Sequence, residues 1–207
     1  MKFLSVLIVT ILLFFNISFL EAAETVRVAS IFGKTGPGAF ANKATIEGVR
    51  FAVRELNRQG GLLGKQIELL EFDNKSSAIH SKLVAQKAVK DEVIAVFGAN
   101  WSSNSLAMAQ VLQAAKIPMI SPLATNPDVT LVGNYIFRVC FIDSFQGTVL
   151  AKFALQDLNV QTAAILINAS ARYSEDLAQF FKQYFEKQGG KIVFQAHYLQ
   201  DTDDFLS

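Results

Sequence analysis

Short apolar runs alternate with longer amphipathic segments along most of this chain. Between Val26 and Val139 the apolar runs predict strands at residues 26–32, 66–72, 93–97, 118–120 and 135–139. Between them, apolar residues that recur at spacings of three and four predict helices at residues 39–58, 77–90 and 104–115. This alternation of strand and helix is typical of the doubly wound α/β class, in which helices cover both faces of a mostly parallel sheet.

The same pattern starts again after Asp143. It predicts helices at residues 144–158 and 174–187, with strands at residues 162–168 and 191–198. Thr202, followed by two aspartates, predicts the capped first turn of a further helix. We therefore expect one complete lobe at residues 24–143 and part of a second at residues 144–207, with the apolar faces of Phe181 and Phe185 partly exposed.

The N-terminal residues have the features of a secretory signal peptide. Met1-Lys2 is followed by an apolar stretch and then by the small residues Ala22 and Ala23. An uncleaved membrane anchor is the alternative, because about 18 apolar residues can just span a bilayer. No cysteine stands at the cleavage region, which argues against a lipid anchor. We predict a signal peptide at residues 1–23 and export to the periplasm.

Composition excludes several classes of function. The net charge is +1, so the chain has no electrostatic signature of nucleic-acid binding. Cys140 is the single cysteine, which excludes an internal disulfide. His80 and His197 have no metal-ligand spacing, and His80 is expected in solvent in an early helical turn. With no G-x-S-x-G motif and no evident base for Cys140, we expect neither an enzyme nor a metal or cofactor site.

A glycine-rich loop, Gly33 to Gly38, superficially resembles a phosphate-binding loop. A Walker motif requires a glycine where this chain has Val28, and the glycine order does not match the dinucleotide fingerprint. A turn that requires glycine torsions and a fixed proline is the favoured interpretation. Asp73, at the end of the second predicted strand, is expected to cap the turn that follows it.

Small polar side chains follow two predicted strands, where ligands bind in doubly wound sheets. After the third strand the chain reads GANWSSNS, which puts Ser102 to Asn104 at the N-terminus of the next helix. Capping requires one side chain, so the surplus hydroxyls beside unpaired amides suggest a carboxylate site; a polar loop with a single cap is the alternative. After the next strand, Ser121 and Thr125 are expected to face the same crevice. Trp101 and Leu123 would be its apolar walls.

Several longer segments resemble the branched-chain amino acid-binding proteins of bacterial ABC transporters, which are two-lobed, type I periplasmic binding proteins. The resemblance runs from about Val26 to Ser207 and is carried by TGPGAFANKATIEGVRFAVRELNRQGGLLGKQIELLEFDN, FGANWSSNS, IPMISPLATNP and YIFRVCFIDSFQG. It implies that the ligand lies between two lobes. It also implies that this chain contains only part of the second lobe.

The resemblance also implies specific ligand contacts. Ser102 matches the serine that holds the ligand carboxylate. The small residue and the threonine that bind the carboxylate and amino group match Leu123 or Ala124 and Thr125, and Tyr173 matches an aromatic residue of the second lobe. An aromatic residue common in the first loop falls on Ala41, so either Phe40 substitutes or that wall is missing. The acidic partner of the ligand ammonium would lie beyond Ser207.

These observations predict an extracytoplasmic solute-binding protein of an ABC transporter. The expected ligand is a branched-chain amino acid or a related small amide, and the expected protein partner is a membrane permease. A sensory ligand-binding module without a transporter is the alternative, and an exported enzyme is a weaker one.

Overall fold

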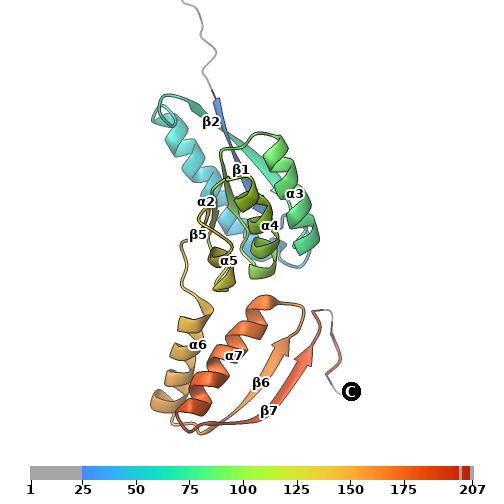
Figure 1. Ribbon diagram of the computed structural model, residues 1–207, viewed down its shortest axis with the longest axis vertical. Helices are drawn as coiled ribbons and strands as arrows, with labels where there is room; N and C mark the ends of the chain where they lie inside the picture. Colours follow the sequence, from blue (N-terminus) through green and yellow to red (C-terminus); the bar gives the residue numbers. More distant parts are fainter. Residues whose placement is uncertain (1–24, 201, 206–207) are drawn as a thin grey trace, which may run out of the picture.

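The computed structural model describes residues 25–200 and 202–205. The predicted signal peptide, residues 1–23, lies outside the described residues. The chain forms two α/β lobes, one above the other in Figure 1, which are joined by the segment between β5 and α6. Within the described residues, no helix has both the length and the apolar character needed to cross a membrane.

The first lobe contains a five-stranded parallel sheet in the order β2-β1-β3-β4-β5. Its strands are β1 (Thr25–Phe32), β2 (Gln66–Asp73), β3 (Ala95–Gly98), β4 (Met119–Ser121) and β5 (Ile136–Arg138). Its helices are α2 (Ala39–Arg58), α3 (Ala78–Lys90), α4 (Ser102–Ala114) and the short α5 (Asp128–Leu131). The order extends outwards in both directions from β1 and β3, so the predicted doubly wound fold is confirmed.

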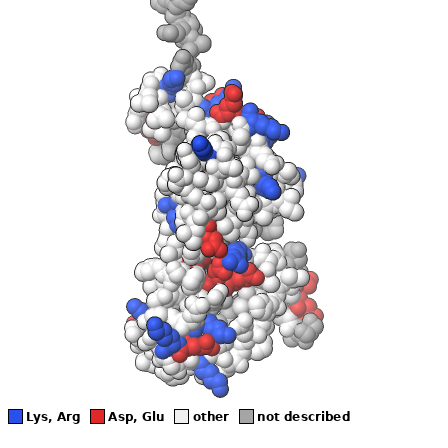
Figure 2. All heavy atoms as spheres, viewed as in Figure 1, with Lys and Arg blue, Asp and Glu red and all other residues white. Residues whose placement is uncertain are grey.

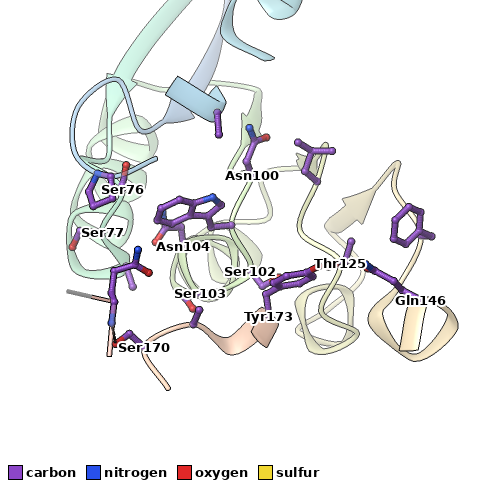
Figure 3. A pocket seen from close by; sticks show the side chains of 18 residues that line it. Ser76, Ser77, Asn100, Ser102, Ser103, Asn104, Thr125, Gln146, Ser170 and Tyr173 are labelled. Atoms are coloured by element: carbon purple, nitrogen blue, oxygen red, sulfur yellow. Dashed lines mark hydrogen bonds between the residues drawn. The ribbon is translucent and has the colours of Figure 1, made fainter. Parts of the chain in front are cut away.

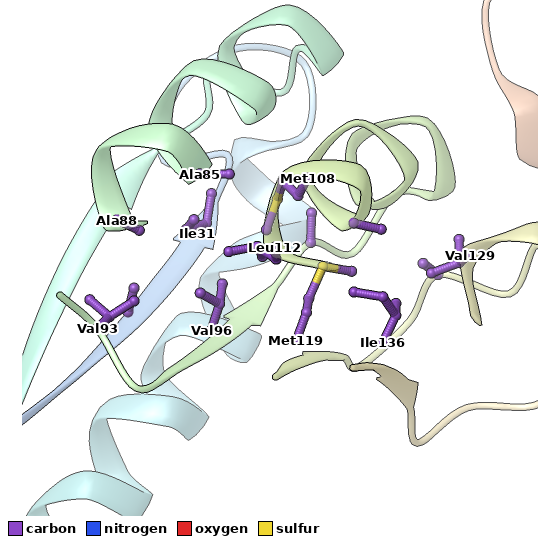
Figure 4. Close-up of a cluster of buried hydrophobic side chains, with 14 residues drawn as sticks. Ile31, Ala85, Ala88, Val93, Val96, Met108, Leu112, Met119, Val129 and Ile136 are labelled. Carbon is purple, nitrogen blue, oxygen red and sulfur yellow. The ribbon is translucent and has the colours of Figure 1, made fainter. Parts of the chain in front are cut away.

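Successive side chains of β1 point to opposite faces of this sheet, and both faces are buried. Ala29 and Ile31 belong to a core beneath α3 and α4, where Met108 and Leu112 are fully buried. Figure 4 shows this cluster between the two helices and the sheet. On the opposite face, Val28 packs in a smaller cluster with residues of α2. Helices therefore cover both faces, and the carboxyl ends of the strands remain at one edge.

The second lobe pairs two parallel strands, β6 (Thr162–Asn168) and β7 (Lys191–Tyr198). Helix α7 (Arg172–Lys187) connects them, and α6 (Asp143–Lys152) packs along α7. A π-helical turn at Phe153–Asp157 replaces the end of the predicted helix 144–158. The expected exposure of Phe185 is wrong: it is fully buried, because its ring stacks on Phe181 at 5.2 Å and packs against Gly190. Exposed apolar side chains lie instead on the strands, at Leu166, Val193 and Phe194.

Two local predictions differ from the structure. Helix α4 begins at Ser102, two residues earlier than predicted, so the polar run lies inside its first turn. Residues 202–205 are not helical, and the Thr202 hydroxyl accepts a hydrogen bond from the Leu199 amide, which precedes it in the chain. That contact closes a local turn at the end of β7 and does not cap a helix.

Candidate functional site

A cavity of about 670 Å³ lies between the lobes, at the carboxyl ends of the strands. Among residues 25–200 and 202–205, no charged side chain lines it. The lining residues are Pro37, Ala41, Ser76, Ser77, Ala78, Asn100, Trp101, Ser102, Ser103, Asn104, Leu123, Thr125, Phe141, Gln146, Ser170, Ala171, Tyr173 and Gln200 (Figure 3). Because β3 and β4 are neighbours in the sheet, the loops after them reach the cavity together, as the sequence predicted.

The N-terminus of α4 opens into this cavity without a side-chain cap. Trp101 occupies the N-cap position in an extended conformation, and no side chain there accepts a hydrogen bond from the first turn. The first amides of an α-helix have no intrahelical acceptor, and they stand at the positive end of the helix dipole. The lining residues Ser102, Ser103 and Asn104 all belong to this first turn. The site can therefore bind an anionic group.

Ser102 is oriented to donate a hydrogen bond. It is 2% exposed, and its Oγ accepts a hydrogen bond from the Asn126 amide at 3.3 Å. Since that contact uses oxygen as the acceptor, the hydroxyl hydrogen is left to donate to a ligand. Thr125 also lines the cavity, and its carbonyl accepts the Asp143 amide at 2.9 Å. The structure thus brings both predicted carboxylate contacts to the same cavity.

Ser121 does not face the crevice, contrary to the sequence-based expectation. It is fully buried, donates to the Ala99 carbonyl at 2.7 Å and accepts the Ala124 amide at 3.0 Å. Ser105, also fully buried, donates to the same carbonyl at 2.9 Å and accepts the Ala99 amide at 3.1 Å. These two hydroxyls hold the loops in shape, because the buried polar groups of Ala99 and Ala124 require partners. They are not free for a ligand.

Leu123 and Ala124, the alternative matches for one contact, lie in different environments. Leu123 is 54% exposed and lines the cavity. Ala124 is fully buried and is absent from the lining. Its amide donates to Ser121, and its carbonyl accepts from Arg138 at 2.8 Å. Since both backbone groups of Ala124 are engaged, Leu123 and Thr125 are the cavity-facing residues of this loop.

Two aromatic side chains that line the cavity come from the N-terminal ends of α4 and α7 and not from the first loop. Trp101 and Tyr173 line the cavity, and Figure 3 shows the Tyr173 ring beside Ser102. Phe40 is 93% exposed and does not line it, so its proposed substitution as a wall is wrong. Ala41, the next residue of α2, is the one that faces inward. A Cβ on Gly38 would lie 2.8 Å from the Trp101 ring, so this glycine allows the indole to pack against the first loop.

The first loop is a hydrogen-bonded turn, as predicted. The Asp73 carboxylate accepts the amides of Lys34 at 2.9 Å and Lys75 at 2.8 Å, and the Thr35 hydroxyl at 2.6 Å. The Ser76 hydroxyl accepts the Gly38 amide at 3.0 Å. Asp73 therefore caps the turn that follows it, which was predicted, and also holds the glycine loop.

One guanidinium fixes the loop that carries Thr125. Arg138, at the end of β5, donates to the carbonyls of Ala124, Asn126 and Pro127 at 2.7–3.0 Å and to the Thr130 hydroxyl at 2.8 Å. Burial lowers the pKa of this guanidinium from its ordinary value. Four hydrogen bonds from one side chain leave the backbone of this loop little freedom.

A buried carboxyl group lies behind the site, at the start of α6. Asp143 is fully buried, and neither carboxyl oxygen has a well-formed hydrogen bond within the described part of the chain. Burial raises the pKa of Asp143, and the negative charge of Asp176 raises it further; the Thr125 hydroxyl and the charge of Arg138 oppose the rise. Asp143 is therefore a group that destabilises the fold when it ionises.

Several lining residues were not predicted from the sequence. Ser76 follows β2, Ser170 follows β6 and Gln200 follows β7, so each lies just beyond the carboxyl end of a parallel strand. The rule that located Ser102 and Thr125 would have found them as well. His80, predicted in solvent, is half-buried, with its Nδ1 buried and unpartnered among the described residues. No cluster of three or more potential metal ligands occurs within residues 25–200 and 202–205.

Known proteins resemble this chain over nearly all of its described length. The model of a family described as periplasmic binding protein matches residues 25–207. The leucine-specific-binding protein of Salmonella typhimurium is 32% identical over 184 residues, which are 88% of this chain and 50% of that protein. The chain therefore spans about half the length of the curated relatives it matches.

Solved structures of binding proteins also align with nearly all of this chain and with about half of their own length. A leucine-binding protein from Thermotoga maritima aligns with a TM-score of 0.83 and 32% identity, covering 87% of this chain and 51% of that one. A branched-chain amino acid transporter substrate-binding protein from Streptococcus pneumoniae, in complex with isoleucine, aligns with a TM-score of 0.82 and 30% identity. That alignment covers 88% of this chain and 52% of that one.

Proposed function

Because this chain belongs to the periplasmic binding protein family, we propose that it binds a small carboxylate ligand, an amino acid, between its two lobes. The observation that carries the proposal is the uncapped N-terminus of α4, which opens with Ser102 into a cavity whose described lining residues are all uncharged. A fixed set of amides and hydroxyls stabilises a carboxylate there without a cationic residue.

The carboxylate lies, in this proposal, between the first turn of α4 and the hydroxyl of Thr125. Ser102 donates through its free hydroxyl hydrogen, since its oxygen already accepts from the Asn126 amide. Each hydrogen bond to a charged group contributes about 1.5–3 kcal/mol. Leu123 and Thr125 are the contacts from the following loop, and the buried Ala124 supports them from behind.

The body of the ligand contacts apolar side chains. Trp101, Leu123 and Tyr173 supply walls that suit an aliphatic side chain. The relatives named above are described as leucine-binding or branched-chain amino acid-binding proteins, which supports a ligand of this class or a related small amide. The same relatives support a binding protein rather than an enzyme.

The proposed biological setting is uptake across a bacterial inner membrane. The chain acts in the periplasm after removal of residues 1–23, and delivers its ligand to the membrane permease of an ABC transporter. In this proposal the first lobe spans residues 24–143 and the second begins at residue 144. The crossover between β5 and α6 is then part of the hinge.

Alanine substitutions at the two carboxylate contacts test the proposal. Replacing Ser102 or Thr125 with alanine should weaken amino-acid binding by about 1.5–3 kcal/mol, which is roughly tenfold to a hundredfold in Kd. Binding would be followed by NMR titration of the 207-residue chain from micromolar to tens of millimolar ligand. Ser144→Ala is the matched control, because the Ser144 side chain makes no hydrogen bond in the described part of the structure and does not line the cavity. Equal affinities in all the variants would refute the site.

A further inference from the structure

Within residues 25–200, one turn at the start of α7 makes three polar contacts with the first lobe. At the start of α7, the Arg172 amide donates to the Ser103 hydroxyl at 3.2 Å. The Arg172 guanidinium lies 3.4 Å from the Asp128 carboxylate. The Asn126 side-chain amide donates to the Asp176 carboxylate. These contacts connect α7 to the first turn of α4, at Ser103, and to Asn126 and Asp128 at the start of α5.

The residues that make the side-chain contacts lie beside the cavity but not in its lining. Those residues are Asn126, Asp128, Arg172 and Asp176. Their neighbours in sequence are the ligand-facing ones: Thr125 precedes Asn126, and Tyr173 follows Arg172. Asn126 also connects directly to the site, because its backbone amide donates to the Ser102 hydroxyl. A movement of α7 away from the first lobe would therefore separate Tyr173 from Ser102.

We propose that Asn126, Asp128, Arg172 and Asp176 form a latch that holds Tyr173 over Ser102 before a ligand arrives. The proposal rests on the proposed function, since it is the wall of the amino-acid site that the latch positions. These four are positioning residues and do not contact the ligand. Their effect is on the fraction of molecules in which the two lobes are already closed.

The two halves of the latch differ in strength. The Asp176 side chain is only 14% exposed; it accepts a hydrogen bond from the buried Asn126 side-chain amide and forms an ion pair within α7 with Arg172, whose Nε lies 3.2 Å away. The ion pair between Arg172 and Asp128 is about half exposed on both sides, so water and salt screen it. Figure 2 shows acidic and basic side chains gathered where the two lobes meet. The hydrogen bond between Asn126 and Asp176 is therefore the stronger contact between the lobes, and the Arg172–Asp128 ion pair is a weaker, salt-sensitive one.

A latch of this kind has a specific signature in binding. The apparent Kd equals the intrinsic Kd divided by the fraction of competent molecules. Loss of the latch lowers this fraction equally for every ligand. All affinities should therefore fall by one common factor, while the order of preference among ligands stays the same. A residue that contacts the ligand changes that order.

Asp176→Ala and Glu175→Ala are the matched variants for the test. Both remove one negative charge from the same helical turn, but Glu175 pairs only within α7, with Arg172 at 3.7 Å. Asp128→Asn, at an exposed position of the first lobe, is a further variant that leaves α7 unaltered. Spin labels at the exposed residues Lys43 in α2 and Lys187 in α7, with Cys140 replaced by serine, would report the interlobe distance without ligand.

We expect Asp176→Ala to lengthen and broaden the distance distribution and to weaken leucine, isoleucine and valine binding by a common factor of roughly ten. Asp128→Asn should produce a smaller change that disappears at high salt, and Glu175→Ala should match the unaltered protein. Distances in Asp176→Ala and Asp128→Asn that equal those of the unaltered protein would overturn the latch, as would a loss of affinity for some ligands only. Because the distances are measured without ligand, they would still decide the latch if no amino acid bound and the proposed function failed.

Discussion

Ser121→Ala should destabilise the first lobe far more than a typical serine substitution. The Ser121 hydroxyl accepts the Ala124 amide and donates to the Ala99 carbonyl, and all three residues are at most 1% exposed. Its removal leaves a buried amide without a partner, which costs about 1–3 kcal/mol, and loses one further hydrogen bond of about 0.5–1.5 kcal/mol. The expected loss is about 2–4 kcal/mol. Ser144→Ala, whose hydroxyl makes no hydrogen bond among the described residues, should change stability by less than about 0.5 kcal/mol.

The two loop serines should also be coupled. After Ser121→Ala the Ala99 carbonyl keeps the Ser105 hydroxyl at 2.9 Å, and after Ser105→Ala it keeps Ser121. Only the double variant leaves that carbonyl unsatisfied, so its loss of stability should exceed the sum of the single losses by about 1 kcal/mol or more. Urea unfolding, followed by the fluorescence of Trp101, the single tryptophan, measures the unaltered chain, the two single variants, the double variant and the Ser144→Ala control. Single variants within 0.5 kcal/mol of the unaltered chain, or a strictly additive double variant, would refute the reasoning.

Two further predictions concern pH. The raised pKa of Asp143 means that its contribution to stability is present below its ordinary value of 3.8 and is lost as pH rises through the folded-state value. Asp143→Asn should therefore increase stability at pH 7 and leave it nearly unchanged at pH 3, measured by urea unfolding at both pH values; a loss at pH 7 would contradict this. The Arg50 guanidinium, which pairs with Glu71 through two hydrogen bonds of 2.6 and 2.7 Å, lowers the pKa of that carboxyl to about 2. The stability that this ionised carboxyl contributes is present above its ordinary pKa of 4.5 and is lost as the pH falls toward 2. Glu71→Gln should therefore lower the thermal midpoint at pH 7 and have little effect near pH 2. An equal drop at both pH values would show that the substitution acts through side-chain packing and not through charge.

The strand ends were the most predictable part of the site. The alternation of apolar runs and amphipathic segments fixed the order of the elements, and parallel strands bring their carboxyl ends to one edge. Ser102 and Thr125 therefore reached the cavity as expected, whereas Tyr173, which also lines it, was expected only from the resemblance to binding proteins. The same rule could not distinguish Ser102 from Ser121, because that difference depends on which hydroxyl faces the buried carbonyl of Ala99. Which hydroxyl bonds to that carbonyl depends on how the two loops pack against each other.

Other features depended on packing that no local pattern contains. Phe40 and Ala41 are adjacent in α2, and a rotation of about 100° about the helix axis decides which one faces the cavity. Phe185 was expected to be exposed, but its ring packs against Phe181 and Gly190 and is fully buried. The contact between Asn126 and Asp176 joins residues that are 50 positions apart in the two lobes. The relative placement of the lobes is needed before such a pair can be recognised.

The central claim is that a carboxylate binds at the N-terminus of α4, and the amide signals of Ser102, Ser103 and Asn104 test it most directly. An NMR titration of the chain with leucine should shift these three signals. Leucinol, which has the same side chain and amino group but no carboxylate, should leave them nearly unmoved at equal concentration. Equal shifts with both compounds, or leucine-dependent shifts confined to other parts of the chain, would contradict the account.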